Sequence, residues 1–447
     1  MKSRKNLVSR RDFVRMSGTL VTGLAAGTAA LTGIPRVHAA EDNTIKIALV
    51  GCGGRGGGAV RDAMRGGGPV KLHALADVFE EKVTSYAKLY SEAFGESGTV
   101  PKERQFTGFD AYKHAVDSLT PGKDLILLAT PAAFRPTHVE YAVNKGVHVF
   151  MEKSFAVDIP GLKRIEAASK LADSKNLKLA CGLMWRHNPP HEETVKRIQD
   201  GMIGEIMHMR TYRMEPAIRL VERRPGETEL AHQIRNYHSF TWTNGSFFLD
   251  WCIHNVDILS WAKNEWPESA IGMGGRTFDT TPGQVFDHQH VEYFFKDGIS
   301  MNGYARHMNG TPCFYTDYVL GTKGMAVILG GFKIMKNCSF GPDNEVVWKF
   351  EGKSSNPYQL EHQLLNDAIR NDKPYNEGHR AVKAGLTGII GRMAFESGQH
   401  ISVDKACESK IELFPNIDHV TWETPAPVQP DANGHYPYAI PGQTVTV

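Results

Sequence analysis

The chain has 447 residues, and 41% of them are hydrophobic, which is enough for two domains with substantial cores. Its 51 basic and 49 acidic residues nearly cancel, so the sequence offers no electrostatic footprint for a nucleic-acid partner. Six scattered cysteines without a Cys-x-x-Cys pair favour free thiols over a disulfide framework.

The first 39 residues have the features of a twin-arginine export signal. Arg10 and Arg11 follow other basic residues, and a mildly apolar run over residues 16–34 comes next. The run is followed by Val37-His38-Ala39, where small residues at the right spacing predict cleavage after Ala39. Removing the seven basic residues and one acidic residue of this leader leaves 44 basic and 48 acidic residues. We therefore expect a mildly acidic, exported or periplasmic protein that uses the twin-arginine export machinery and has no stable membrane span.

Short apolar runs alternate with amphipathic stretches between residues 45 and 150. The runs predict buried strands over 45–50, 70–76, 124–129 and 147–150, and the stretches between them predict helices over 55–65, 79–94 and 136–145. This alternation is typical of an α/β fold with a parallel, doubly wound sheet. We expect an N-terminal Rossmann dinucleotide-binding domain over residues 44–155. A further helix over 159–174 and a strand over 177–181 either extend this domain or lead to the next one.

The second half of the chain has a different pattern. Strand-like runs lie close together over 206–212, 290–295, 300–307, 315–320 and 326–328, which indicates a large, mainly antiparallel open sheet. Helices predicted over 251–262, 359–371 and 380–397 would cover one face of that sheet. We expect a C-terminal α/β domain over residues 156–414. The Pro-rich tail, residues 415–447, is expected to form an arm across the chain's own surface or a neighbouring subunit.

The strongest chemical signal is the glycine-rich turn Gly51-Cys52-Gly53-Gly54-Arg55-Gly56, which follows the first strand and opens a helix. In a dinucleotide fingerprint, Gly51 permits the tight turn, Gly53 lets the backbone approach a pyrophosphate, and Gly56 allows close helix packing. The second strand ends at Asp77, where a carboxylate accepts from the ribose 2′-hydroxyl and repels a 2′-phosphate. NAD is therefore favoured, whereas a phosphate contact from Arg55 would admit NADP.

Three further segments resemble the Gfo/Idh/MocA family of oxidoreductases, and the resemblance covers nearly all of the mature chain. They are Ala129-Thr130-Pro131 followed by His138, then Met151-Glu152-Lys153, and the segment 245–257 with its Asp250, His254 and Asp257. The usual Glu-Lys-Pro of the family reads Glu152-Lys153-Ser154 here, and Cys252 replaces a glycine. The resemblance implies an open sheet that builds homo-oligomer contacts and a sugar, polyol or derivative as substrate. It also implies cofactor contacts from Gly51, Gly53, Gly54, Arg55, Gly56, Asp77, Thr130, Pro131, His138, Glu152 and Lys153.

The resemblance further implies a catalytic cluster of Lys153, Asp250 and His254. Oxidation of a secondary alcohol needs a base for the hydroxyl proton, and His254 has a suitable ordinary pKa. Asp250 lies four residues earlier on the same helical face and could tune it, and the Lys153 ammonium could stabilise alkoxide charge. The alternative is structural: Asp250 caps a helix, His254 is a core residue, and Lys153 is a surface lysine.

Two other segments are candidates for substrate binding. Trp185, Arg186 and Asn188 match in position a segment near the nicotinamide in relatives. Tyr237 and His238 offer the aromatic and hydrogen-bonding groups that sugars favour, although ordinary packing would account for either segment. His288 and His290 share a strand face without a third ligand at a telling spacing, so we expect no metal site.

The leader constrains the mechanism. NAD is a cytoplasmic metabolite and the twin-arginine route carries folded proteins, so the cofactor must be loaded before export and held tightly. The bound nicotinamide must then be reset on the enzyme. The sequence favours an exported NAD(P)-dependent oxidoreductase of a sugar, polyol or glycoside. The alternatives are a glycosidase-like enzyme that oxidises, eliminates, hydrates and reduces in one redox-neutral cycle, and a non-catalytic binding protein that keeps the nucleotide as a structural element.

Overall fold

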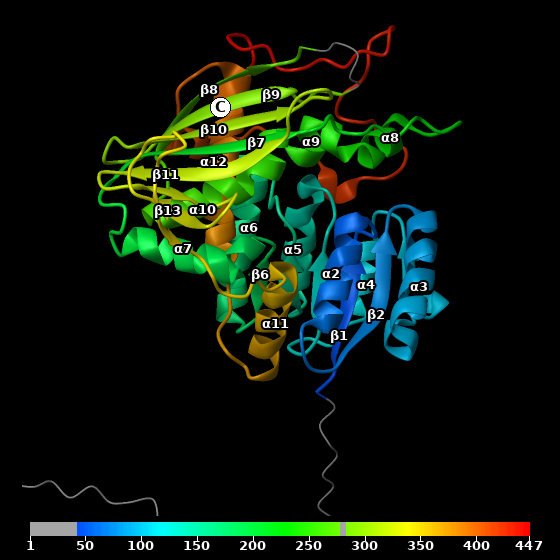
Figure 1. Cartoon of the computed structure of the whole chain (residues 1–447). Coiled ribbons are helices and arrows are strands. Elements are labelled where there is room, and N and C mark those ends of the chain that lie inside the picture. Colours follow the sequence, from blue (N-terminus) through cyan, green and yellow to red (C-terminus); the bar gives the residue numbers. More distant parts are fainter. Residues whose placement is uncertain (1–42, 278–282) are drawn as a thin grey trace, which may run out of the picture. The chain divides into compact units, whose positions relative to one another are not determined.

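The computed structural model describes residues 43–277 and 283–447, so the expected leader, residues 1–39, lies outside the described residues. Residues 43–447 form one compact unit that contains two β-sheets. Figure 1 shows the first sheet with helices α2 to α6 in blue to teal, and strands β7 to β13 of the second sheet in green to yellow. This is the predicted fold class, a parallel Rossmann-like sheet followed by an α/β part with a mainly antiparallel sheet.

The first sheet has six parallel strands in the order β3-β2-β1-β4-β5-β6. Its central strands are buried on both faces, which explains their continuous apolar sequences. The strands are β1 (Ile45–Val50), β2 (Val70–Asp77), β3 (Gln105–Thr107), β4 (Leu125–Leu128), β5 (His148–Met151) and β6 (Leu179–Cys181). The sheet thus continues beyond residue 155, because β6 pairs with β5 and extends the Rossmann part.

Helices cover both faces of the first sheet. Two separate apolar cores, one on each face, join these helices to the strands. One face carries α2 (Gly54–Arg65), α3 (Glu80–Phe94) and α11 (Pro357–Arg370), and the other carries α4 (Ala111–Asp117), α5 (Arg135–Asn144), α6 (Ile159–Ser174) and part of α12 (Gly378–Ser397).

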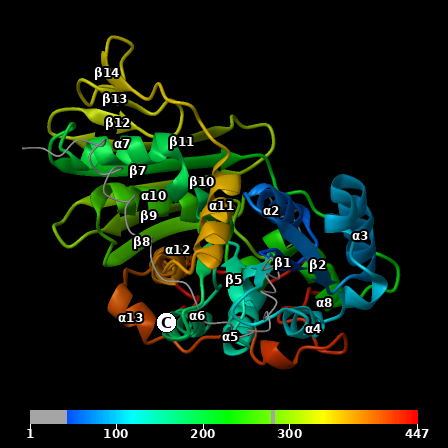
Figure 2. The same ribbon diagram turned by 90° about the horizontal axis from the view of Figure 1, so that it is seen from below.

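The position of α11 corrects one expectation from the sequence. The helix predicted over 359–371 does not cover the second sheet but packs beside α2 on the first one (Figure 2). Leu365 enters the core of that face, and the Asn366 side chain donates to the Ala63 carbonyl at 3.3 Å. Amphipathic periodicity shows that a helix has one apolar face, but it does not show which sheet receives that face.

The second sheet has nine strands in the order β14-β13-β12-β11-β7-β10-β9-β8-β15. The ladders are antiparallel except for that between β7 and β10. The strands are β7 (Ile206–Glu215), β8 (Ser269–Gly275), β9 (His288–Phe294), β10 (Ser300–His307), β11 (Phe314–Gly321), β12 (Met325–Val327), β13 (Lys333–Met335), β14 (Val346–Lys349) and β15 (Ile401–Ser402). Five of these strands were predicted, and the short or weakly alternating β8, β13, β14 and β15 were missed.

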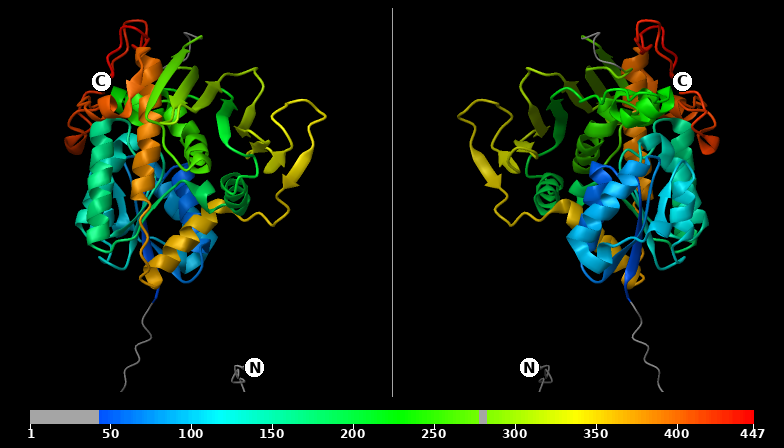
Figure 3. Two further views of the ribbon diagram at one scale, coloured as in Figure 1. Left: turned by 90° about the vertical axis from the view of Figure 1, so that its left-hand side faces the viewer. Right: turned by 90° about the vertical axis from the view of Figure 1, so that its right-hand side faces the viewer.

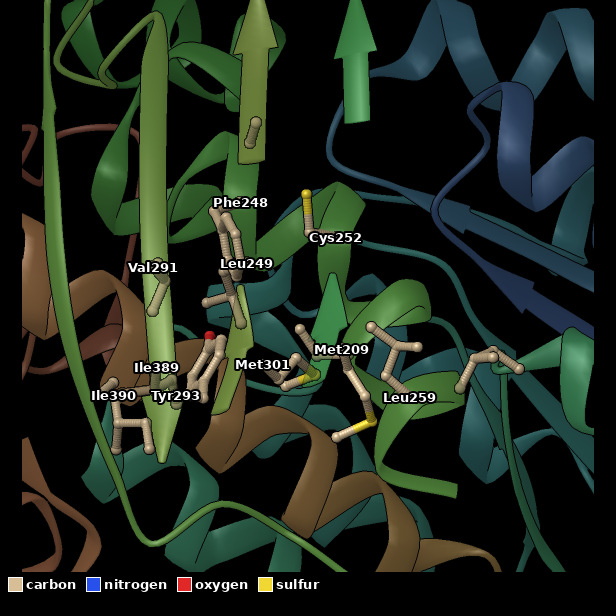
Figure 4. Close-up of a cluster of buried hydrophobic side chains, with 14 of the residues drawn as sticks. Met209, Phe248, Leu249, Cys252, Leu259, Val291, Tyr293, Met301, Ile389 and Ile390 are labelled. Atoms are coloured by element: carbon tan, nitrogen blue, oxygen red, sulfur yellow. The ribbon is translucent and has the colours of Figure 1, made fainter. Parts of the chain in front are cut away.

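A large apolar core joins the second sheet to helices that cross its inner face. Met209, Val291 and Met301 from the strands meet Leu249 and Ile389 from the helices (Figure 4). The remaining helices of this part are α7 (Pro189–Gln199), α8 (Glu229–Arg235), α9 (Thr241–Asn244), α10 (Ile253–Lys263) and α13 (Val403–Cys407). The long helix α12, orange in Figure 3, contacts both this sheet and α6, and so ties the two parts of the molecule together.

The C-terminal tail packs against its own chain. Phe414, Val420, Val428 and Tyr436 are buried in one cluster with Trp242. Farther along, the Thr446 hydroxyl donates to the Met393 carbonyl of α12 at 3.3 Å. Of the two alternatives that the sequence left open, the structure therefore shows an arm across the chain's own surface.

Candidate active site

A groove of about 380 Å³ lies at the carboxyl ends of β1, β2, β4 and β5. The loops after these strands form one wall, and residues from 221 to 250 of the second half form the other. The strands are added outward from β1 on one side, to β3, and from β4 on the other, so the strand order switches between β1 and β4. Open α/β sheets bind ligands at this kind of switch point, outside the carboxyl ends of the strands.

The glycine turn has the shape that a dinucleotide requires. Gly51 has a φ of +100°, and a Cβ there would lie 2.7 Å from the carbonyl carbon of Ala129. A Cβ on Gly56 would lie 2.1 Å from the Gly51 carbonyl oxygen, so this position also excludes any side chain. No atom lies within 4 Å of a Cβ built on Gly53 or Gly54, so the backbone there is open to a ligand at the start of α2. The turn therefore fits a pyrophosphate at a helix N-terminus.

Asp77 is held beside this turn at the end of β2. Its carboxylate accepts from the backbone NH of Cys52 at 2.7 Å and from that of Phe79 at 3.0 Å. Burial raises the pKa of Asp77, and these two donors offset part of that rise. The carboxylate also lines the groove, so it can still accept from a ribose hydroxyl.

The Arg55 guanidinium is already paired with carboxylates, so it is not free to bind a phosphate. Its Nε lies 2.7 Å from Glu152 Oε1, and its Nη2 donates to Asp62 at 3.2 Å. The guanidinium also lies over the ring of Tyr358, 4.5 Å from its centroid. Because carboxylates already occupy this cation, the sequence argument that Arg55 would admit a 2′-phosphate loses its support. The buried carboxyl of Glu361 adds to the same cluster, and burial raises its pKa well above the ordinary value.

The predicted Thr130, Pro131 and His138 lie together beyond β4 and line the groove. The Thr130 hydroxyl lies 3.4 Å from His138 Nδ1, and the His138 ring stacks on Tyr112 at 4.2 Å. Burial lowers the pKa of His138 to about 3, so its ring is neutral. Sequence reasoning missed the buried Arg135 beside them, which donates to the carbonyls of Thr130 and Ser154 and so joins the loops after β4 and β5.

Lys153, Asp250 and His238 meet at the other end of the groove. Lys153 Nζ lies 2.5 Å from Asp250 Oδ1, and His238 Nδ1 lies 3.1 Å from Asp250 Oδ2. Burial alone would raise the pKa of Asp250, but the Lys153 ammonium and His238 hold it well below the ordinary value. The Ser154 hydroxyl donates to the Leu249 carbonyl at 2.9 Å, so the residue that replaces the family's proline also fastens this loop to the segment that carries Asp250.

The partner of Asp250 differs from the one that the sequence suggested. A π-helical turn, Phe248–Cys252, precedes α10 and carries Asp250, and both carboxylate oxygens face Lys153 and His238. His254 instead lies against Trp185, with ring centroids 4.9 Å apart. Burial, together with Lys153 and Arg213, lowers the pKa of His254 well below its ordinary value, so this imidazole is neutral. The charge of Asp250 still raises the pKa of His254, as the sequence interpretation expected, although its carboxylate oxygens pair with Lys153 and His238.

The predicted substrate residues divide into two groups. Tyr237 and His238 line the groove, with ring centroids 3.9 Å apart, and Trp185 lies beside His254. Arg186 is committed elsewhere, because it forms a two-pronged ion pair with Asp257 in which both contacts are 2.8 Å long. The buried Asn188 contacts His191 Nδ1 at 2.7 Å and precedes α7, so it too serves the local structure.

Asn244 is a groove residue that the sequence did not reveal. It is 2% exposed, and its Nδ2 has no hydrogen-bond partner among residues 43–277 and 283–447. A buried amide donor without a partner is costly unless a ligand or water satisfies it, and this side chain lines the groove. No sequence motif marks Asn244. Only its position in the groove of the folded chain identifies it.

Other sequence features are occupied by local contacts. His290 Nε2 lies 2.7 Å from Asn302 Oδ1, and His288 Nδ1 lies 2.7 Å from Asp287 Oδ1. Within the described ranges, no group of three His, Cys, Asp or Glu residues is placed to hold a metal ion. The six cysteines, all of which lie in those ranges, are unpaired. No helix in the part of the chain that the structure covers is long and apolar enough to cross a membrane.

Comparison with known proteins supports the assignment that the geometry suggests. Residues 191–327 match the GFO/IDH/MocA C-terminal domain. An inositol 2-dehydrogenase from Rhizobium meliloti is 25% identical over 248 residues, which span 56% of this chain and 64% of that protein, a little less than two thirds of its length. Over residues 191–327 the chain is therefore similar to the C-terminal domain of the Gfo/Idh/MocA oxidoreductases.

Two further similarities bear on the function of the chain. A glycosyl hydrolase family 109 protein from Solibacter usitatus is 25% identical over 211 residues, covering 45% of this chain and 44% of that protein. The crystal structure of scyllo-inositol dehydrogenase from Lactobacillus casei with bound NAD(H) and scyllo-inositol covers 81% of this chain and 99% of its own. Its TM-score is 0.58 at 20% identity, which establishes the shared fold.

Proposed function

We propose that the protein is an exported NAD-dependent oxidoreductase that acts on a secondary alcohol of a sugar, polyol or glycoside. The observation that carries this proposal is the arrangement of one groove, with a glycine turn and Asp77 at one end and Lys153, Asp250 and His238 at the other. The similar proteins support it, because their names include inositol dehydrogenases and one of them was solved with NAD(H).

The residues of the fingerprint would hold the cofactor. The backbone of Gly53 and Gly54 would receive the pyrophosphate, and Asp77 would accept from the adenosine ribose. When bound, the nicotinamide supplies the hydride acceptor and donor. Arg55 is already paired with Glu152 and Asp62, which favours NAD over NADP.

The groups at the reaction end would manage the proton of the substrate hydroxyl. Lys153 would stabilise negative charge on the reacting oxygen, and Asp250 would hold Lys153 in place through the 2.5 Å contact. The base would be a histidine, and two are available. Geometry favours His238, because an imidazolium formed there lies 3.1 Å from the Asp250 carboxylate. At His254, burial and the charges of Lys153 and Arg213 oppose the same imidazolium.

Export and a captive cofactor belong to the same proposal. The leader, residues 1–39, supports twin-arginine export of a folded chain, and an exported enzyme has no pool of NAD to exchange with. The nucleotide would then be loaded in the cytoplasm and reset on the enzyme in each cycle. The open second sheet would provide homo-oligomer contacts.

The test is to denature purified mature protein and to measure released nucleotide by mass spectrometry and absorbance. One NAD(H) per chain after dialysis is the expected result, and the loaded protein should then turn over a member of a panel of inositols and hexoses. Protein that neither contains NAD(H) nor binds it at millimolar concentration would contradict the proposal. Turnover that is lost in Lys153→Ala while nucleotide stays bound would exclude a non-catalytic binding protein.

A second candidate function is a glycosidase-like cycle of oxidation, elimination, hydration and reduction. The similarity to a glycosyl hydrolase family 109 protein favours it. A redox-neutral cycle also suits a nucleotide that never leaves. This candidate predicts cleavage of an aryl glycoside without added NAD, and uptake of solvent deuterium at the carbon beside the oxidised one. Paired oxidation and reduction of two free sugars without cleavage would favour the first candidate.

A further inference from the structure

The adenosine end of the groove is covered by residues from three distant parts of the chain. Phe79 follows Asp77 at the end of β2, and Phe109 follows β3. The Arg235 guanidinium lies 3.7 Å from the centroid of the Phe79 ring, on the second half's wall of the groove. Trp422 of the C-terminal tail packs against both aromatic rings, with its ring centroid 5.8 Å from Phe79 and 4.7 Å from Phe109.

Ion pairs connect two of these parts across the groove. Glu81, in the first turn of α3, lies 2.8 Å from Arg224 and 2.8 Å from Arg235. Arg235 is in turn held by Glu227, at 2.5 Å from its Nε. These pairs keep the pKa of Glu81 below its ordinary value, even though burial opposes that. Because the arginines line the groove, the pairs bridge its two walls.

An apolar cluster fixes the tail over this end. Phe134, from the loop after β4, and Trp242, from the second half, have ring centroids 6.1 Å apart. Phe414, directly before the tail, lies 4.8 Å from Trp242, and Val420 is buried in the same cluster only two residues before Trp422. These buried residues anchor the tail where it crosses the surface, and so hold Trp422 in position.

We propose that residues 221–235 and residues 413–428 form a clamp that retains the adenosine half of a dinucleotide. The inference rests on the proposed function, because the ligand is the NAD of that proposal. The clamp surrounds the end where Asp77 would meet the ribose, and its aromatic and guanidinium faces are suited to an adenine ring. Release of the nucleotide then requires the Glu81 pairs and the Trp422 contacts to open together, so the clamp slows dissociation.

The test is an exchange experiment on the full mature chain with its own nucleotide. Protein is mixed with excess deuterium-labelled NAD, and the labelled fraction on the protein is followed by mass spectrometry. We expect exchange to be accelerated by about tenfold or more in Trp422→Ala, because the contacts of Trp422 with Phe79 and with Phe109 are both lost. Glu81→Gln should accelerate exchange by about threefold, as for a partly exposed ion pair.

Matched controls separate the clamp from general damage. Glu80→Gln changes the neighbouring carboxylate, which pairs with Lys102 of the same half, and Tyr438→Ala removes an exposed ring of the tail. Both should exchange at the wild-type rate. Trp422→Phe should restore most of the retention if Trp422→Ala folds poorly. Equal rates in Trp422→Ala, Glu81→Gln and wild type would overturn the clamp.

The outcome for wild-type protein distinguishes the two proposals. Protein that binds added NAD but exchanges it within seconds overturns the clamp and leaves the NAD-dependent function standing. Protein that binds no NAD at all overturns the proposed function, and the clamp with it. Slow wild-type exchange that is accelerated only by the clamp variants supports both.

Discussion

The two ends of the groove are built from different chemistry. At the adenosine end, Phe79 and Phe109 line the groove together with arginines, and Trp422 packs against both rings. At the reaction end, Lys153 and Asp250 are paired charges whose side chains are 18% and 6% exposed. Apolar and aromatic surface gives affinity without a fixed direction, whereas a buried charge is costly and is useful only when its position matters.

This difference assigns separate jobs to the two ends. Changes at the adenosine end should alter how long and how selectively the nucleotide stays, with little effect on the chemical step. Changes at the reaction end should stop turnover while the nucleotide remains bound. Measuring kcat and the bound nucleotide per chain on each variant tests this separation.

The largest effect is expected for Lys153→Met. The change removes the ammonium that would stabilise the alkoxide and leaves Asp250 buried beside His238, so kcat should fall by about a thousandfold or more. Bound NAD(H) per chain, measured by mass spectrometry, should stay at the wild-type value. Lys163→Met is the control, because the Lys163 ammonium donates only to the Cys407 carbonyl on the exposed side of α6. Loss of the nucleotide together with turnover would show that Lys153 serves binding and not chemistry.

The two histidines give the next effect. We expect His238→Gln to lower kcat by about a hundredfold, because the base that Asp250 would stabilise is lost. His254→Gln keeps the polar contact beside Trp185 and should lower kcat less, with a higher KM. Steady-state kinetics with both variants decides between the histidines. The reverse ranking would return the role of base to His254, as the sequence motif implies.

A smaller effect is expected at Asp77. Asp77→Ser removes the carboxylate that would accept from the ribose and repel a 2′-phosphate, so the preference for NAD over NADP should fall by about tenfold to a hundredfold. Isothermal titration of nucleotide-free protein with both dinucleotides measures it, and kcat for bound NAD should change little. An unchanged preference would mean that another group reads the ribose.

The smallest effect concerns the stability of the folded chain at acid pH. The buried His362 ring lies against Phe150, with ring centroids 4.2 Å apart, and burial lowers its pKa from 6.5 to about 3. The folded chain keeps this ring neutral while the unfolded chain takes up a proton below about pH 6.5, so stability falls as the pH drops from there toward 3. The loss at pH 5 is about 2 kcal/mol.

His362→Phe should remove that loss. Free energies of unfolding from urea titrations at pH 7 and pH 5 measure it, and the gap between the two pH values should narrow in the variant. His379→Phe is the control, because the His379 side chain is 62% exposed and lies outside the core. An unchanged gap would show that other buried histidines, such as His138, account for the acid sensitivity.

The predictable part of the fold followed from local pattern. Strand β1 and helix α6 lie where the apolar periodicity placed them, because buried parallel strands and amphipathic helices leave a strong signal in sequence. The short edge strands β13 and β15 were missed, since three or two residues carry no period. The helix α11 was predicted correctly, but the sheet against which it packs was predicted wrongly. An apolar helix face does not show which surface covers it.

The same division holds in the site. By itself, the sequence determined the glycine turn, Asp77 and the Lys153 loop, because each function there depends on a residue type at a fixed distance along one short stretch. Only the tertiary structure decided that Asp250 faces His238, that Glu152 holds Arg55, and that Trp422 contacts Phe79. These contacts join residues 12 to 343 positions apart, and long-range packing brings such residues together without leaving a spacing that can be read along the chain.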